Sequence, residues 1–334
     1  MILIMGVAGL MAFKGGAFGG GGLQVWHYLG PLQTIDANDD GFADPLGFAM
    51  HVSARDEYTT LMAVSGKDGS VLWESKSFGK LGNVASARII TTKNALFVAQ
   101  DAGRLRGFNK NTGEATWATQ LPEKADRFCP GSDASHVVIE TAGDEWLTLN
   151  TGDGSLSQHE PAMDCLPLTA LTMEYPEGNT KGVSEYEEYE KLSEMRVHHV
   201  FQWVGSDVAI AFGSRAKGTD VPMIGAYRIA DNQPLWTSEV PARNPLSART
   251  GAPNGQINAE VAAVVYEQND VPRISVFRIA DGTRLWDIAV PQRWGVAGLA
   301  IDNDRLFVSS AGLYRFDLAT GALKFVTAAT TNPR

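Results

Sequence analysis

The amino-acid sequence predicts an all-β fold made of repeated units. An eleven-residue pattern recurs six times, with alternating residues first, a turn next, and an aromatic residue at the end of most copies. Each copy carries glycine or asparagine four positions before its end, and these residue types tolerate positive φ. The copies end at positions 73, 117, 158, 236, 286 and 325, so four of the five intervals span 39 to 50 residues. A four-stranded unit at this period is the signature of a β-propeller.

Each copy predicts one β-hairpin. Four copies end in tryptophan: Ala63 to Trp73, Gly107 to Trp117, Ala226 to Trp236 and Val276 to Trp286. Thr148 to Gln158 has lost the aromatic residue, and Arg315 to Phe325 carries phenylalanine instead. The turn residues are Gly69, Gly113, Gly154, Asn232, Gly282 and Gly321. We expect the second strand of each hairpin to return antiparallel and the five terminal aromatics to be buried between units.

Upstream of most hairpins lies a second pair of predicted strands. Examples are Ala87 to Gln100, Val261 to Tyr266 and Val296 to Ser309, where Asp302 and Asn303 mark a turn. The chain is therefore predicted to form a single propeller of about six four-stranded blades. We also expect strands from both chain ends to share one blade, because such closure removes an exposed sheet edge.

The 78-residue interval between positions 158 and 236 breaks the period. It holds either a seventh blade or one blade with an insertion. The composition favours an insertion at about 174–196, because Glu174 to Arg196 contains seven glutamates and no strand-like alternation. Ser184 to Met195 reads as a short acidic helix, with Ser184 as N-cap and Glu187 completing a capping box. The insertion is either a solvated surface excursion or an element that docks a partner.

Composition and charge narrow the class of protein. The 334 residues are 44% hydrophobic and 20% charged, which is typical of a globular chain. The net charge of -10 opposes binding to nucleic acid and to anionic membrane surfaces. Residues 1–22 contain an apolar run too short to span a bilayer, followed by a glycine-rich linker. This segment is either a membrane anchor or signal remnant, or a tail that packs on the propeller domain at 23–330.

The hairpin pattern resembles the repeat of the PQQ-like β-propeller family. In that repeat, alanine, any residue, aspartate, two residues, Thr-Gly and three residues precede tryptophan. The copy ending at Trp117 matches, with Gly107 and Asn109 in place of the alanine and aspartate. The family includes quinone-dependent dehydrogenases, the propeller lipoprotein of the outer-membrane barrel assembly machinery, and secreted or anchored proteins. The resemblance implies the fold over roughly residues 30 to 325, but membership does not determine activity.

The quinone-dependent members carry adjacent cysteines over the cofactor, and this sequence departs from that pattern. Its two cysteines, Cys129 and Cys165, lie 36 positions apart. PQQ is therefore not expected. Because both flank the third repeat, we predict that they form a disulfide, which indicates an extracytoplasmic location. The alternative is two buried thiols in a cytosolic protein.

One short motif predicts a metal site. Residues Asp36 to Asp44 read DANDDGFAD, and a calcium loop would take its oxygen ligands from Asp36, Asn38, Asp40, the Phe42 carbonyl and Asp44. Gly41 provides the sharp turn. The motif resembles the aspartate-rich loop of FG-GAP propeller repeats, in which calcium has a structural role. The alternative is an Asx-rich turn without metal, and Asp39 is expected to point to solvent or cap the turn.

The sequence favours a non-catalytic propeller that binds or scaffolds a partner outside the cytoplasm. The partner would be a protein or small ligand at the central funnel or at the acidic insertion, and membrane contact would come only through an N-terminal anchor. The alternative is a hydrolase or lyase acting in the funnel. No zinc, nucleotide-binding or nucleophile-elbow motif occurs in the sequence.

Overall fold

A computed structural model gives the protein's structure. It describes residues 23–26, 32–52, 57–160, 195–240 and 255–327, apart from short gaps at 81–83, 85–86, 93, 101, 132, 203–206, 216–220, 229, 232, 270, 291–297 and 310–311. No helix occurs among these residues, and none of them forms a span that is long and apolar enough to cross a membrane as a helix.

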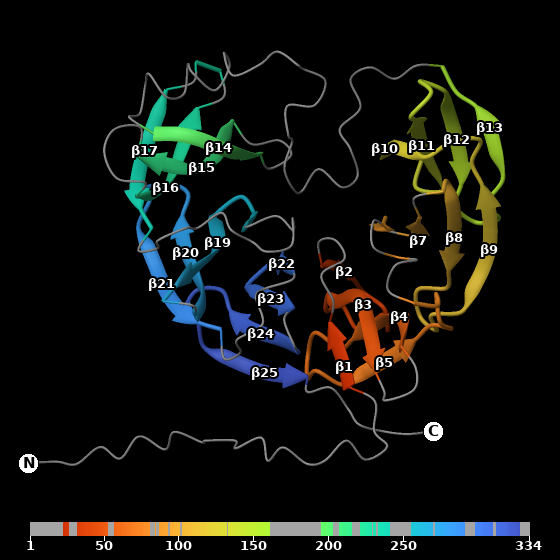
Figure 1. The fold of residues 1–334 in the computed structure, drawn as a ribbon, viewed down its shortest axis with the longest axis horizontal. Helices are drawn as coiled ribbons and strands as arrows, with labels where there is room; N and C mark the ends of the chain where they lie inside the picture. The colour runs from red at the N-terminus through yellow and green to blue at the C-terminus, as the bar shows by residue number, and fades with distance from the viewer. Residues whose placement is uncertain are drawn as a thin grey trace, which may run out of the picture.

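Six antiparallel sheets lie around a common centre, which confirms the predicted all-β propeller (Figure 1). The first three blades consist of β1 (Leu23–Trp26), β2 (Gln33–Ile35), β3 (Asp44–Val52), β4 (Glu57–Val64) and β5 (Val71–Glu74); β6 (Arg88–Thr91), β7 (Leu96–Ala99), β8 (Arg104–Phe108) and β9 (Ala115–Gln120); and β10 (Ala125–Pro130), β11 (His136–Thr141), β12 (Trp146–Asn150) and β13 (Leu156–Gln158).

The remaining three blades follow the same order. They consist of β14 (Met195–Gln202), β15 (Val208–Arg215), β16 (Pro222–Arg228) and β17 (Pro234–Glu239); β18 (Gly255–Ile257), β19 (Val261–Gln268), β20 (Val271–Arg278) and β21 (Arg284–Ala289); and β22 (Gly298–Asp302), β23 (Arg305–Ser309), β24 (Leu313–Asp317) and β25 (Leu323–Thr327). We number the six sheets as blades 1 to 6 in this order. Strands of neighbouring blades contact one another, as β2 does with β6 and β18 does with β22.

The ring closes differently from the prediction. Every described sheet consists of strands that are consecutive in the sequence, so no blade combines strands from the two ends. Side chains join blade 6 to blade 1 instead. Arg315 donates hydrogen bonds to the carbonyls of Gly66 and Lys67 at 2.8 and 2.9 Å, and the Arg305 guanidinium lies 4.4 Å from the centre of the Phe42 ring. A buried cluster that includes Met62 and Phe307 fills the junction.

The predicted hairpin turns are confirmed wherever the structure describes them. Gly69, Gly113, Gly154, Gly282 and Gly321 all have φ between 70° and 82°, a region in which a Cβ atom is unfavourable. Asn232, the sixth turn residue, lies outside the described residues. The turn predicted at Asp302 and Asn303 is also present, with Asn303 at φ 47°.

The tryptophans join consecutive blades. The ring of Trp73 in blade 1 lies against Gly113, the turn glycine of blade 2, and its Nε1 donates to the carbonyl of Lys110 at 2.7 Å. Trp117, Trp236 and Trp286 repeat this contact with the next blade, against Gly154, Gly282 and Gly321 and the carbonyls of Thr151, Ile279 and Leu318. We call each such contact a tryptophan lock. The repeat thus pairs a glycine with the tryptophan of the preceding blade.

The predicted burial of these aromatics is only partly correct. Trp73 and Trp286 are buried, with 7% and 9% of their surface exposed. Trp117 and Trp236 are only half-buried. The side chain of Phe325 lies outside the described part of the structure.

Two other predictions concern chain outside the described residues. The predicted acidic helix falls almost entirely in 161–194, although its last residue, Met195, is the first residue of β14. The N-terminal segment 1–22 is not described either. The strands of the propeller run from Leu23 to Thr327.

Candidate functional site

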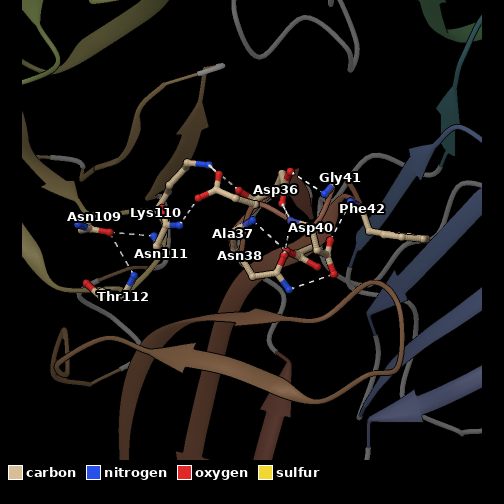
Figure 2. A network of polar contacts seen from close by, with 12 residues as sticks. Asp36, Ala37, Asn38, Asp40, Gly41, Phe42, Asn109, Lys110, Asn111 and Thr112 are labelled. Atoms are coloured by element: carbon tan, nitrogen blue, oxygen red, sulfur yellow. Dashed lines mark hydrogen bonds and ion pairs between the residues drawn. The ribbon is translucent and has the colours of Figure 1, made fainter.

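The Asp-rich loop connects β2 to β3 at the inner end of blade 1. Its side chains bind the loop's own backbone N–H groups. Asp36 accepts from the amides of Asp40 and Gly41, each at 3.1 Å, and Asp40 accepts from Phe42 at 2.9 Å (Figure 2). Asn38 accepts from the Asp40 amide at 3.1 Å. These bonds fold the loop tightly, with Gly41 at φ 80° as the sequence predicts.

Asp44 anchors the loop to the blade. Its carboxylate is fully buried and accepts hydrogen bonds from the amides of Ala37 at 2.9 Å and Gly66 at 2.8 Å. Burial raises the pKa of Asp44, these two N–H groups act in the opposite direction, and the negative charges of Asp40 and Asp36 add to the rise. The loop therefore concentrates negative charge around a desolvated carboxylate.

Asp39 points out of the loop toward blade 2. It has φ 58°, and its carboxylate accepts from Lys110 Nζ and Asn111 Nδ2, both at 2.6 Å. Lys110 Nζ also donates to the carbonyl of Asp36 at 2.8 Å. The hydrogen bond from Lys110, together with that from Asn111, lowers the pKa of Asp39. The sequence assigns Asp39 to solvent or to capping the turn, whereas in the structure its carboxylate links the loop of blade 1 to Lys110 and Asn111 of blade 2.

The chemistry of this loop suits a hard cation. Carboxylate and carbonyl oxygens are the ligands that calcium prefers, and the five predicted groups all come from one nine-residue segment. Within the described part of the chain, however, no group of three or more histidine, cysteine, aspartate or glutamate side chains is arranged to hold a metal ion. Calcium binding at this loop stays a prediction.

A cavity of about 400 Å³ lies beside the loop, where blades 1 and 2 meet. Its lining comes from the end of β2, the β6 to β7 connection and the β8 to β9 turn: Thr34, Ile35, Asp36, Thr91, Thr92, Ala95 and Lys110. Three threonines, one lysine and one aspartate thus line a space of the size that holds a small ligand or a side chain. Sequence patterns do not reveal this cavity, because its walls come from segments far apart in the chain.

Cys129 lies in β10 and is fully buried. Its predicted partner, Cys165, lies outside the described residues, so the disulfide stays a prediction. Val138 and Trp146 pack with Cys129 on the same face of blade 3.

Two polar clusters across strands have no signal in the sequence. In blade 1, Thr60 and His51 both contact Glu74, and the Tyr58 ring stacks on His51 with 4.4 Å between ring centres. In blade 5, the Asp287 carboxylate accepts hydrogen bonds from three neighbouring side chains: Tyr266, Arg273 and Ser275. Strand register alone brings these residues together, which is why spacing in the sequence does not predict them.

Comparisons with solved structures find similar propellers at low identity. BamB from Moraxella catarrhalis is 12% identical, with 91% of this chain and 89% of that chain covered and a TM-score of 0.30. The C-terminal WD40 domain of Sif2 is 12% identical over 85% and 97% of the two chains, with a TM-score of 0.47. The Swd1 propeller of Myceliophteria thermophila is 8% identical over 90% and 86%, with a TM-score of 0.33. A comparison with curated proteins finds no similar sequence.

Family models give the decisive comparison. The model described as "Outer membrane protein assembly factor BamB" matches residues 21–165 and 57–327, which together include all strands of the six blades. The match agrees with the PQQ-like repeat and with the fold. The chain therefore belongs to the family of the outer membrane protein assembly factor BamB.

Proposed function

We propose that this protein is a non-catalytic β-propeller that binds other proteins outside the cytoplasm and takes part in the assembly of outer-membrane proteins. The observation that carries the proposal is the family match across the whole propeller. A propeller suits this role, because its closed ring of sheets is a rigid scaffold for the strands and loops that would contact a partner.

The cavity between blades 1 and 2 is the proposed contact point. Its hydroxyl and ammonium groups would bind polar side chains or main-chain groups of a partner loop. Lys110 Nζ makes two hydrogen bonds within the protein, and an ammonium group has three donors, so one more bond is open to a ligand. Because Asp39 already balances the charge of Lys110, an uncharged polar group suits the cavity better than an anion.

Two experiments test the proposal. Deleting the gene should lower the amount of folded β-barrel protein in the outer membrane, and the intact gene should restore it. Normal levels in the deletion strain would contradict the role in assembly. For the contact point, Thr91→Arg places a long side chain in the cavity and should weaken binding of the purified protein to assembly components. The matched control is Thr283→Arg, at an exposed turn of blade 5, which should bind normally.

We also propose that calcium binds the Asp-rich loop in a structural role. The support is the crowding of Asp36 and Asp40 near Asp44, whose pKa rises through burial and through their charges. A divalent cation would relieve this repulsion. The site would then stabilise the junction of blades 1 and 2, because Asp39 extends from the same loop to Lys110.

A further inference from the structure

The sequence contains four aspartate-glycine pairs, and the structure places all four in tight turns. In each turn the aspartate carboxylate accepts a hydrogen bond from the amide two positions ahead, at 2.9 or 3.0 Å. This bond folds the carboxyl group back over the amide of the glycine. Because glycine has no side chain to shield its nitrogen, the aspartate Cγ is open to attack by that nitrogen. The pairs are Asp40-Gly41, Asp68-Gly69, Asp153-Gly154 and Asp281-Gly282.

Three of the pairs form the hairpin turns of blades 1, 3 and 5, and their contacts oppose this attack. Each glycine amide donates to a main-chain carbonyl four residues earlier at 2.9 Å, and a carbonyl oxygen is too weak a base to take the proton. In two of these turns the tryptophan ring of the preceding blade also covers the glycine, since Trp117 lies on Gly154 and Trp236 on Gly282. The amide protons of these turns are therefore held by groups that cannot accept them.

The pair in the Asp-rich loop, Asp40-Gly41, has different surroundings. Both residues are exposed, and beyond the adjoining residues a Cβ atom on Gly41 would meet no described atom within 4 Å. The Gly41 amide donates to Oδ2 of the Asp36 carboxylate at 3.1 Å, so a base lies within hydrogen-bonding distance of the proton that must leave (Figure 2). Asn38 Nδ2 donates to Oδ2 of Asp40 at 3.2 Å and would stabilise negative charge on that oxygen. This pair thus combines an open glycine with a carboxylate base.

We propose that Asp40-Gly41 is a modification site at which the chain isomerises to isoaspartate without an enzyme, with Asp36 as the base. Asp40 reacts with one proton on its carboxyl group. The Gly41 nitrogen bonds to Cγ of Asp40 as Asp36 takes the amide proton. The bond from Cγ to its hydroxyl then breaks, and the hydroxyl leaves as water with that proton.

A second water completes the isomerisation. Its oxygen adds to the main-chain carbonyl carbon of Asp40, the bond from that carbon to the Gly41 nitrogen breaks, and the nitrogen takes a proton of the water. The chain then runs through Cγ, and its mass is unchanged. Isomerisation therefore adds one carbon to the main chain between Asp39 and Gly41.

The added carbon lies next to a contact between two blades. Asp39 is the residue through which this loop bonds to Lys110 and Asn111 of blade 2, at 2.6 Å each. A longer main chain beside Asp39 should displace its carboxylate from both partners. The isomerised protein should therefore have a weaker contact between blades 1 and 2 than the original protein.

Peptide mapping by liquid chromatography and mass spectrometry tests the proposal on the full chain. The folded protein is incubated with a chelator, so that no calcium occupies the loop. An isoaspartate peptide elutes apart from the aspartate peptide at the same mass. We expect isoaspartate to form at position 40 roughly tenfold or more faster than at positions 68, 153 and 281. A rate at position 40 that does not exceed the other three would overturn the proposal, as would the same preference for position 40 in the denatured chain.

The variant Asp36→Asn tests the base. Its amide oxygen still accepts a hydrogen bond from the Gly41 amide but cannot take the proton, so the rate at position 40 should fall to that of the other three pairs. The matched control, Asp144→Asn, removes the same charge from an exposed turn of blade 3 and should leave the rate unchanged. An unchanged rate in Asp36→Asn would overturn the role of Asp36. The comparison of the four pairs in the wild type does not depend on whether this variant folds.

Discussion

The tryptophan lock of blades 1 and 2 allows a quantitative test by a double-mutant cycle. Trp73 is 7% exposed, so Trp73→Ala removes a nearly fully buried ring and leaves the Lys110 carbonyl without its donor. Such a truncation costs about 3–5 kcal/mol of unfolding free energy. Gly113→Ala acts on the other side of the same contact. Its new Cβ would lie 2.3 Å from Cε3 of Trp73, at a φ of +70°.

Two separable effects make up the cost of Gly113→Ala. The left-handed backbone conformation costs roughly 1–2 kcal/mol with any Cβ atom. The overlap with the ring adds about 1–3 kcal/mol, which is typical of overpacking. When Trp73 is already alanine, the overlap disappears and the backbone term remains. The double variant should therefore be about 1–3 kcal/mol more stable than the sum of the two single losses predicts.

Guanidinium unfolding followed by circular dichroism measures all four proteins of the cycle. Gly282→Ala combined with Trp73→Ala is the matched control, because Gly282 contacts Trp236 in another junction and the two losses should add. If the losses of unfolding free energy in Trp73→Ala and Gly113→Ala add up in the double variant, the proposed contact between Trp73 and Gly113 is refuted. A loss under about 1 kcal/mol for Trp73→Ala would show that the ring contributes little to the junction.

Three further predictions follow from the sites. If calcium binds the Asp-rich loop with a dissociation constant of about 10 µM, 1 mM free calcium should raise the free energy of unfolding by about 2.7 kcal/mol. Chelation should remove this stabilisation, and Asp40→Ala should abolish it. A melting curve that calcium leaves unchanged would contradict the site. Denatured, unreduced protein should show no free thiol, because the predicted disulfide uses both Cys129 and Cys165. In the chain-entropy model this disulfide would raise the free energy of unfolding by roughly 4 kcal/mol. Two titratable thiols would disprove the disulfide. Asp133 lies in the turn between β10 and β11 of blade 3. Hydrogen bonds from Ser135 and His136 lower its pKa from 3.8 to about 2, so its contribution to stability should be complete above pH 3.8 and be lost as the pH falls through 2. Unfolding of the wild type and Asp133→Asn across this range should converge at the acidic end, and parallel curves would contradict the assignment.

The repeat in the sequence was sufficient to predict the blades. A hairpin needs only local signals, namely alternation in the strands and a residue that accepts positive φ in the turn. Both are visible from Ala63 to Trp73 and from Val276 to Trp286, and the structure forms a hairpin at each. The Asp-rich loop is equally local, since its side chains bind amides only a few residues away.

The relations between blades were determined by the tertiary structure alone. The sequence shows a tryptophan and a glycine in each repeat, but it does not show that the tryptophan packs on the glycine of the next blade. Closure by Arg315, the outward turn of Asp39 to Lys110, and the cavity near Thr91 join segments that are far apart in the chain. The sequence alone therefore determined the repeating unit, because hairpin energetics are local, whereas the ring and its sites depend on how the blades pack.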